Sequence, residues 1–373
     1  MEGPMTTDSH NCTSPADDEF TGNEWWVIET MGLPYNLRPT LVARGSHKRQ
    51  FATFTRELRD KAQAKAILDI ITRVTETGAP HTPADDVDAN TIDRAFDTYV
   101  YPIKTDSGKV AGVQLWRGLR GNTPPPKRHV GTFEFDCTTQ RTQQSRDLEV
   151  GIMGMPDHQD TRTLPQLWPK LSFDEREKYS TYMEKLFAGN FEPGDPFSST
   201  VEVDIAGSDR RRLTYMTVRA ITEDGNATPV VFGLVHDISD TPGTVRTDDR
   251  EMTRAAVQLA KKIGGVGEIV MRTGYVCEWF RAPPGSLSRW VHSVPFFDLQ
   301  LHHQLTTALD ELLSGTAGRV KLLHGAIRFG DLELEEVSTE IELIAVGHDR
   351  ETGQPNQCLI RAVAIEDLPA GMW

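Results

Sequence analysis

The stretch that decides the fold runs from Leu213 to Ile238 and reads LTYMTVRAITEDGNATPVVFGLVHDI. Its two apolar runs, Leu213–Ile221 and Pro229–Asp237, are separated by a polar segment that contains Glu-Asp-Gly. Tight chain reversals favour aspartate and glycine, because these residues accept backbone conformations that most side chains resist. The stretch therefore predicts an antiparallel β-hairpin.

An amphipathic helix followed by a glycine precedes this hairpin, and the same order occurs three times along the chain. Glycine just after the last apolar residue supplies the left-handed conformation that ends a helix. The helices are expected at Lys65–Thr77, Asp174–Ala188 and Leu299–Ser314, and they end at Gly78, Gly189 and Gly315. The other hairpins are expected at Tyr99–Lys104 with Val110–Trp116, and at Glu340–Val346 with Gln357–Ile365. This repetition indicates internal duplication.

The second and third segments carry further strand patterns. Alternating apolar residues predict strands at Gly131–Asp136, Ser199–Ile205 and Ala326–Val337. Strands, short helices, a longer helix and three antiparallel strands make an α+β plan, in which each sheet buries one face under helices. We therefore expect three tandem modules, each an antiparallel sheet with helices packed on one face.

Breaks rich in proline and glycine divide the chain. The segment RGNTPPPKR at 120–128 separates two apolar-patterned regions, and a second break, SDTPGT, lies at 239–244. The expected organisation is a disordered tail at 1–22, module 1 at 23–119, a Pro-rich linker at 120–128, module 2 at 129–240, a linker helix at 245–264 and module 3 at 265–370.

Composition and charge exclude several classes of protein. The chain has 373 residues, and 40 Lys and Arg against 54 Asp and Glu give a net charge of −14. This acidic balance argues against nucleic-acid binding. No run approaches the roughly 20 apolar residues of a membrane span, and the N-terminus lacks the pattern of a secretory signal. We expect a cytoplasmic protein whose four cysteines, Cys12, Cys137, Cys277 and Cys358, are reduced thiols.

The second segment also carries motifs of a known family. These are GTFEFD at 131–136, LWPKL at 167–171, FDER at 173–176, and the strands Thr200–Asp204, Arg212–Arg219 and Val231–Ile238. They resemble the PAS domain family. The first segment is similar from its helix onward, and the third by element order and by its end at Ala362–Glu366. As a tandem PAS-domain protein without an output domain, the chain is similar to uncharacterised actinobacterial PAS-containing proteins.

The resemblance implies a sensory or protein-interaction module, often dimeric. Some members bind haem, flavin or small apolar ligands between the sheet and the long helix. We expect no resident cofactor, because the only Asn-Cys pair, at Cys12, lies in the tail, and flavin photochemistry needs a reactive cysteine in a helix. Haem would need an axial histidine. His302 or His303 would then be the ligand, although a surface position is more common for such a histidine.

Apolar residues of the long helices either fill the core or line a preformed pocket. Module 2 is the better candidate for a pocket, since methionine and aromatic residues are dense there and methionine adapts to irregular shapes. The expected pocket residues are Phe133, Phe135, Met153, Trp168, Met183, Phe187, Met216 and Phe232.

The linker helix presents a narrow apolar stripe, formed by Met252, Ala255, Leu259 and Ile263. Such a stripe either packs back on a neighbouring module or pairs with its copy in a homodimer. We expect a homodimer.

Catalytic constellations are not evident in the sequence. It contains no G-x-S-x-G elbow, paired carboxylates such as Asp85-Asp86 are adjacent rather than set across a cleft, and the basic run Arg210–Arg212 is expected at a solvated turn. We expect a non-enzymatic PAS-type sensory or regulatory protein that binds a small apolar ligand, a protein partner or both, and signals in trans. The alternatives are a scaffold of ligand-free modules for protein interactions, and an enzyme that uses a degenerate PAS cleft.

Overall fold

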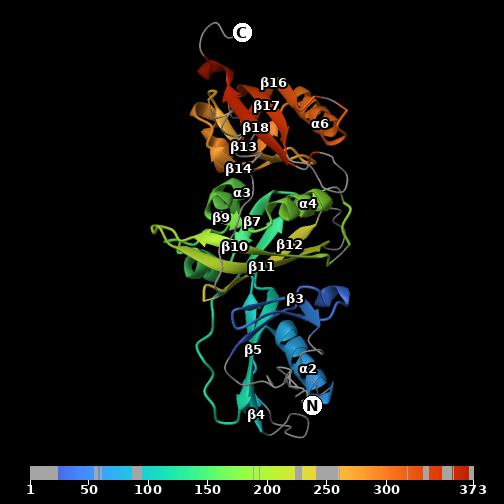
Figure 1. Cartoon of the computed structure of the whole chain (residues 1–373), viewed down its shortest axis with the longest axis vertical. Coiled ribbons are helices and arrows are strands. Elements are labelled where there is room, and N and C mark those ends of the chain that lie inside the picture. The colour runs from blue at the N-terminus through green and yellow to red at the C-terminus, as the bar shows by residue number, and fades with distance from the viewer. Residues whose placement is uncertain are drawn as a thin grey trace, which may run out of the picture.

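The computed structural model of the chain describes residues 24–53, 58, 61–85, 95–187, 189–192, 194–222, 229–240, 259, 261–316, 318–330, 336–346, 355 and 357–368. These residues form three antiparallel sheets, one in each of three modules stacked along the long axis, with the second module in the middle (Figure 1). No helix among them is long and apolar enough to cross a membrane.

Module 1 is a five-stranded sheet in the order β3-β2-β1-β5-β4. Its strands are β1 (Trp26–Glu29), β2 (Thr40–Arg44), β3 (His47–Thr53), β4 (Phe96–Lys104) and β5 (Val110–Leu119), with short helices η1 (Leu33–Tyr35) and η2 (Pro83–Asp85). Helix α2 (Lys61–Thr77) buries Ile67, Ile71 and Val74 against one face of the sheet. The predicted helix and hairpin are confirmed. The three strands before the helix were not predicted, because they are short and β3 is mostly polar.

Module 2 is a seven-stranded sheet in the order β8-β7-β6-β12-β11-β10-β9. Its strands are β6 (Val130–Asp136), β7 (Arg141–Gln144), β8 (Arg162–Thr163), β9 (Leu171–Phe173), β10 (Pro196–Asp204), β11 (Arg211–Ile221) and β12 (Val230–Asp237). Its helices are the π-helical η3 (Asp147–Ile152), α3 (Leu164–Leu167), η4 (Trp168–Lys170) and α4 (Arg176–Phe187). The hairpin predicted from the opening stretch is confirmed as β11 paired with β12.

Module 3 is a six-stranded sheet in the order β14-β13-β18-β17-β16-β15. Its strands are β13 (Gly265–Val270), β14 (Tyr275–Arg281), β15 (Pro295–Phe297), β16 (Val320–Phe329), β17 (Val337–Val346) and β18 (Gln357–Ala364). Its helices are η5 (Gly285–Val291), α6 (Leu299–Leu313) and η6 (Ile365–Asp367). The Asp298 carboxylate caps α6 by accepting a hydrogen bond from the Leu301 amide at 2.6 Å.

One strand of module 3 was predicted in the wrong place. The expected strand Ala326–Val337 is β16, which lies at Val320–Phe329. The strand was predicted to extend further because apolar residues also alternate at Leu332 and Leu334, which lie outside the described ranges. The true start of the strand was hidden, because Val320 to Leu323 interrupts the alternation with two adjacent leucines.

Modules 2 and 3 share one topology. In both, the first strand lies between the second and the last, as β7-β6-β12 and β14-β13-β18. The last three strands are neighbours in the order β12-β11-β10 and β18-β17-β16. Three antiparallel sheets in three modules confirm the coarse plan. The chain is richer in strand than that plan implies, because three strands precede the helix of module 1 and the short β8, β9 and β15 widen the other sheets.

Modules 1 and 2 pack sheet against sheet. Apolar side chains of both sheets form one cluster, which includes Val27, Val42, Ile103, Phe232 and Leu234. A buried ion pair joins Arg219 Nη2 to Glu29 Oε1 at 2.6 Å. Module 2 therefore has one sheet face against module 1 and the other under its own helices.

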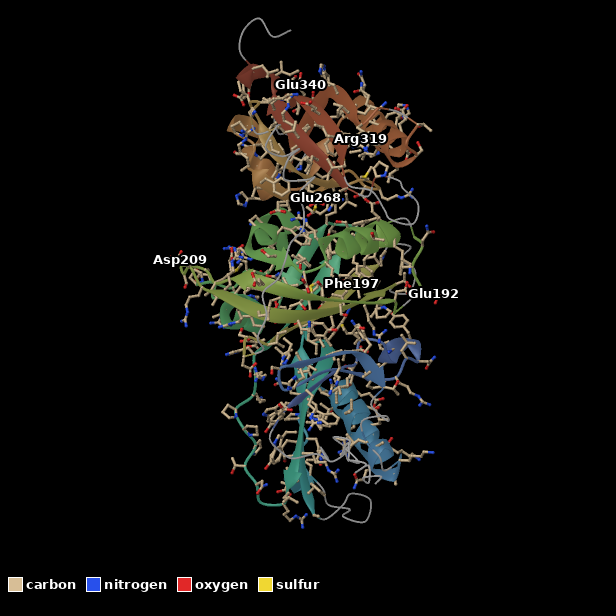
Figure 2. All side chains as sticks on the ribbon, in the orientation of Figure 1. Glu192, Phe197, Asp209, Glu268, Arg319 and Glu340 are labelled. Atoms are coloured by element: carbon tan, nitrogen blue, oxygen red, sulfur yellow. The ribbon has the colours of Figure 1, made fainter. Side chains whose placement is uncertain are left out.

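Modules 2 and 3 meet through the helices of module 2 and the β13–β14 hairpin. Glu268 lies at this junction (Figure 2), where Arg176 pairs with Glu268 and, at 2.6 Å, with Glu278. The Tyr275 hydroxyl donates to the Gln140 carbonyl at 3.0 Å. Val270, Tyr275 and Cys277 of module 3 belong to the same apolar cluster as the helices of module 2.

The basic run at the start of β11 is only partly a solvated turn. Asp209 lies at the projecting tip of the β10–β11 hairpin (Figure 2), and Arg210 and Arg211 are exposed. Arg212 instead donates to the Ile152 carbonyl at 3.0 Å. The expectation of a solvated tip was therefore wrong for Arg212, which ties β11 to the end of η3.

Candidate ligand-binding site

A cavity lies inside module 2, between the sheet face that the helices cover and the helices themselves. Its volume is about 80 Å³, several times the roughly 10–15 Å³ that a single buried water requires. The walls are aromatic, aliphatic and methionine side chains with a few polar groups, as in sites for small organic molecules.

The pleat of the sheet decides which side chains reach the cavity. Successive residues of a strand point to opposite faces, so Phe133 and Phe135 of β6 face it together. In β11, Met216 and Val218 do the same. Met183 of α4 closes the opposite wall.

Six of the eight residues that the sequence singled out line the cavity. These are Phe133, Phe135, Met153, Trp168, Met183 and Met216. The other two do not. Phe187, at the last residue of α4, packs half-buried at the edge of the core of module 2.

Phe232 lies on the opposite face of the sheet, in the cluster shared with module 1. Its neighbours in β12, Val231 and Val235, face the cavity instead. Both faces of β12 are buried, and its sequence VVFGLVHD is an almost continuous apolar run. A run of this kind does not reveal which alternate set faces which side.

Several lining residues were not singled out from the sequence. They include Thr142, Gln144, Leu148, Leu167, Phe173, Tyr179, Tyr182, Val201 and Val203. Thr142 and Gln144 lie in the short strand β7, directly opposite Phe135 and Phe133. Arg-Thr-Gln-Gln is polar at every position, so the sequence carried no signal that Thr142 and Gln144 would be buried; their burial alternates only in the folded strand.

The lining is electrically neutral. No aspartate, glutamate, lysine, arginine or histidine is among the described residues that line the cavity. Burial raises the pKa of the Tyr179 and Tyr182 phenols, so both stay protonated at neutral pH. The Thr214 hydroxyl is already committed, since it donates to the Val201 carbonyl at 2.8 Å.

Two buried polar atoms of the lining have no protein partner. They are Oε1 of Gln144 and Nε1 of Trp168, and the side chains that carry them are 6% and 5% exposed. A buried polar group without a partner is rare and destabilising. Both side chains belong to the lining of the cavity.

The wall of the cavity nearest module 3 is an aromatic cluster. The ring centroids of Trp168 and Phe173 are 4.5 Å apart, and those of Trp168 and Tyr179 are 4.7 Å apart. Trp168, Tyr179 and Met183 also line a second, smaller cavity of about 20 Å³ at the junction with module 3. The same three side chains therefore touch both the main cavity and the junction.

Glu184 is an ionisable group at this junction whose protonation state changes near neutral pH. Its Oε1 accepts a hydrogen bond from the Met271 amide at 2.7 Å, and Arg272 Nε lies 3.9 Å from its Oε2. Burial raises the pKa of Glu184 to about 7, against the opposing effect of these two partners. The carboxyl group therefore changes charge near neutral pH while it faces module 3.

The stripe expected on the linker helix is only partly within the described residues. Met252 and Ala255 lie outside them. Leu259 is buried against Val266, Val346 and Leu359 of module 3, so at this position the stripe packs back on its own chain. Ile263 is 45% exposed.

Histidines and cysteines of interest lie away from the cavity wall. His302 and His303 are exposed on α6. Cys137, Cys277 and Cys358 are buried and form no disulfide, and Cys12 is outside the described residues. Among the residues that the structure describes, no group of three or more His, Cys, Asp or Glu is arranged to hold a metal ion.

A known family model matches the first part of the chain. Residues 24–126, which include module 1, match the family model described as Rv3651-like, N-terminal. None of the curated proteins matches this chain in sequence.

Solved structures add a likeness of the whole fold. The crystal structure of an uncharacterized protein from Mycobacterium tuberculosis is similar with a TM-score of 0.65 and 16% identity, over 91% of this chain and 95% of that one. An RNA-binding Light-Oxygen-Voltage receptor reaches a TM-score of 0.25 at 12% identity, over 64% of this chain and 95% of that one, and a similarity this low carries no argument. The chain thus shares its fold, over nearly its whole length, with the mycobacterial protein, and its first module matches the Rv3651-like N-terminal family model.

Proposed function

We propose that this chain is a tandem PAS-type sensory or regulatory protein that binds a small, largely apolar ligand in module 2 and signals in trans through a protein partner. The observation that carries the proposal is the neutral cavity of about 80 Å³ between the sheet and α4. That is where the PAS resemblance of the sequence implies a ligand.

The walls of the cavity support a sensory role. Trp168, Tyr179 and Met183 line both the cavity and the junction with module 3. A ligand that moves any of these side chains also changes the packing against the β13–β14 hairpin, because close-packed interiors transmit displacement. Binding in module 2 would thus alter how module 3 sits, and this is the change that a partner would detect.

The chemistry of the lining favours a binding protein over an enzyme. General acid–base catalysis needs a group whose pKa lies near the working pH. The ionisable side chains among the described lining residues are Tyr179 and Tyr182, and burial moves the pKa of each further from neutrality.

Native mass spectrometry of the protein purified from its own host tests the proposal. The expected result is a bound small molecule on the wild type that is lost in Val201→Trp, which fills the cavity. Val320→Trp is the matched control, since Val320 is 53% exposed in module 3. Wild-type protein that carries no small molecule, and takes up none from a host extract, would contradict the proposal.

A scaffold for protein interactions is the second candidate. The edge strands β15 and β16 of module 3 and the start of α6 expose four large apolar side chains, which are Phe296, Leu299, Val320 and Leu322. Exposed apolar surface of this kind often marks a protein interface. Val320 and Leu322 replaced together by Asp would abolish partner binding under this alternative and leave ligand binding unchanged.

We also propose a homodimer in which the linker at 245–264 takes part; among its described residues, Ile263 is an exposed apolar one. Sedimentation of the full chain with and without Ile263→Asp tests this. A monomeric wild type at micromolar concentration would exclude it.

A further inference from the structure

We infer that the ligand of module 2 carries an uncharged hydrogen-bond donor, as in an alcohol or a phenol, which binds Gln144 Oε1 while the apolar remainder fills the cavity. The inference rests on the proposed function and deepens it by naming the chemical class of the ligand. It follows from the position of Gln144, from its unpaired oxygen and from the absence of charge in the described lining.

Gln144 is held at the cavity by strand pairing. It is the last residue of β7 and lies directly opposite Phe133 of β6. Directly paired residues of neighbouring antiparallel strands point to the same face of the sheet. Gln144 therefore faces the same side as Phe133, and both line the cavity.

The Gln144 side chain is 6% exposed, and among the described residues none donates a hydrogen bond to its Oε1. An amide oxygen accepts hydrogen bonds and cannot donate them. Leaving it unpaired in the interior destabilises the fold, whereas a donor brought by a ligand removes that penalty. The oxygen therefore selects for a donor.

Charge on the ligand is disfavoured. An ionised group taken into a buried site without a counter-charge is strongly destabilised. Arg176 is a cation beside the aromatic wall, and its guanidinium lies 6.0 Å from the Trp168 ring centroid. Arg176 is already paired with Glu268 and Glu278 of module 3.

The Trp168 indole does not indicate a second polar group on the ligand. Its Nε1 is also buried and without a protein partner, but Trp168 lines the junction cavity as well as the main one. Gln144 alone therefore defines the polar group that we infer for the ligand.

Three probes that share the ethylbenzene framework test the inference on the full chain by isothermal titration at pH 7. They are 4-ethylphenol, a neutral donor; ethylbenzene, which has no polar group; and 4-ethylbenzoate, an anion. We expect 4-ethylphenol to bind about fivefold more tightly than ethylbenzene, as one net hydrogen bond provides. We expect 4-ethylbenzoate not to bind.

Two glutamine variants locate the effect. Gln144→Leu should remove the advantage of 4-ethylphenol and leave ethylbenzene binding unchanged. Gln143→Leu is the matched control, because Gln143 is the preceding residue of the same strand and is exposed. Gln143→Leu should bind all three probes as the wild type does. Gln144→Met serves the same purpose if the leucine variant does not fold.

The outcomes separate this inference from the proposed function. Equal affinity for 4-ethylphenol and ethylbenzene, the same response in both glutamine variants, or binding of 4-ethylbenzoate would overturn the inference while the ligand-binding function stands. Failure of all three probes to bind folded wild type would also overturn it. The proposed function is decided independently by the native mass spectrum.

Discussion

Gly233 leaves room for the ring of Phe133, which lines the cavity from β6. It is paired directly with Phe133 across β12 and β6, and a Cβ at Gly233 would come within 2.1 Å of the Phe133 ring. We expect Gly233→Ala to push the ring into the cavity, to destabilise the protein by about 1–3 kcal/mol through overpacking, and to weaken ligand binding. Urea denaturation and titration with ethylbenzene measure the two effects.

Gly318→Ala is the control for this substitution. A Cβ at Gly318 would have no neighbour within 4 Å, so a change within about 0.5 kcal/mol is expected. If Gly233→Ala proves as neutral as the control, then Phe133 has room to move and does not define the cavity wall.

At the residue scale, composition predicted well which module holds the cavity, but the sequence did not predict which face of the sheet each side chain occupies. Methionine and aromatic residues concentrate in module 2, and six of the eight chosen from that concentration line the cavity. Phe232 was expected in the cavity, but it points to the opposite face of the sheet, because successive residues of β12 alternate between the two faces. Gln144 was missed because a polar residue in a short strand shows its importance only when its cross-strand partner, Phe133, is known.

At the element scale, β1 and β11 are joined by the buried ion pair of Glu29 and Arg219. Arg219 also donates from Nη1 to the Gly194 carbonyl at 2.5 Å. We expect Arg219→Met to destabilise the protein by about 3–5 kcal/mol, because it leaves the Glu29 carboxylate buried without its cation. The combined change Glu29→Met with Arg219→Met should restore a large part of this loss. Thermal unfolding of the single and double variants measures both.

Arg211→Met is the matched control in the same strand. Arg211 is paired with Glu202 and Asp204, but its side chain is 57% exposed, so a loss below about 1 kcal/mol is expected. A double variant no more stable than Arg219→Met would show that the packing of the arginine, rather than the stranded charge, is what the interface needs.

Elements with strong periodicity were predicted well. The helices expected at Lys65–Thr77 and Leu299–Ser314 are α2 and α6, within a few residues at their ends. The three hairpins also form as expected. The strands of module 1 before its helix were missed because they are short and β3 is mostly polar, and β16 was shifted because its apolar residues do not alternate regularly.

At the scale of the whole molecule, Glu184 couples the junction of modules 2 and 3 to pH. Its pKa in the folded protein is about 7, above the ordinary value near 4.3. Between these two values the folded state holds the proton more tightly than the unfolded state, so stability falls as pH rises through 7. We expect wild type to lose on the order of 1–2 kcal/mol more than Glu184→Gln between pH 5.5 and pH 8.5, as measured by thermal unfolding.

Glu175→Gln controls for the loss of one acid, since the Glu175 side chain is 46% exposed and pairs with Lys178 at the surface. Its pH dependence should match that of wild type. Identical pH profiles for wild type and Glu184→Gln would mean that the carboxyl group titrates as it does in water and that the junction does not sense pH.

The sequence by itself determined the local plan of this protein. Helical periodicity, glycine stops and turn residues act over a few neighbouring positions, so they specify three helix-and-hairpin modules and the apolar richness of the second. The tertiary structure decided what surrounds each face. Module 1 covers one side of the β6–β12 sheet and module 3 covers the helices on the other. Burial on both faces removes the alternation of polar and apolar residues. Only the folded chain therefore separates Phe133 from Phe232 and brings Gln144 to the cavity.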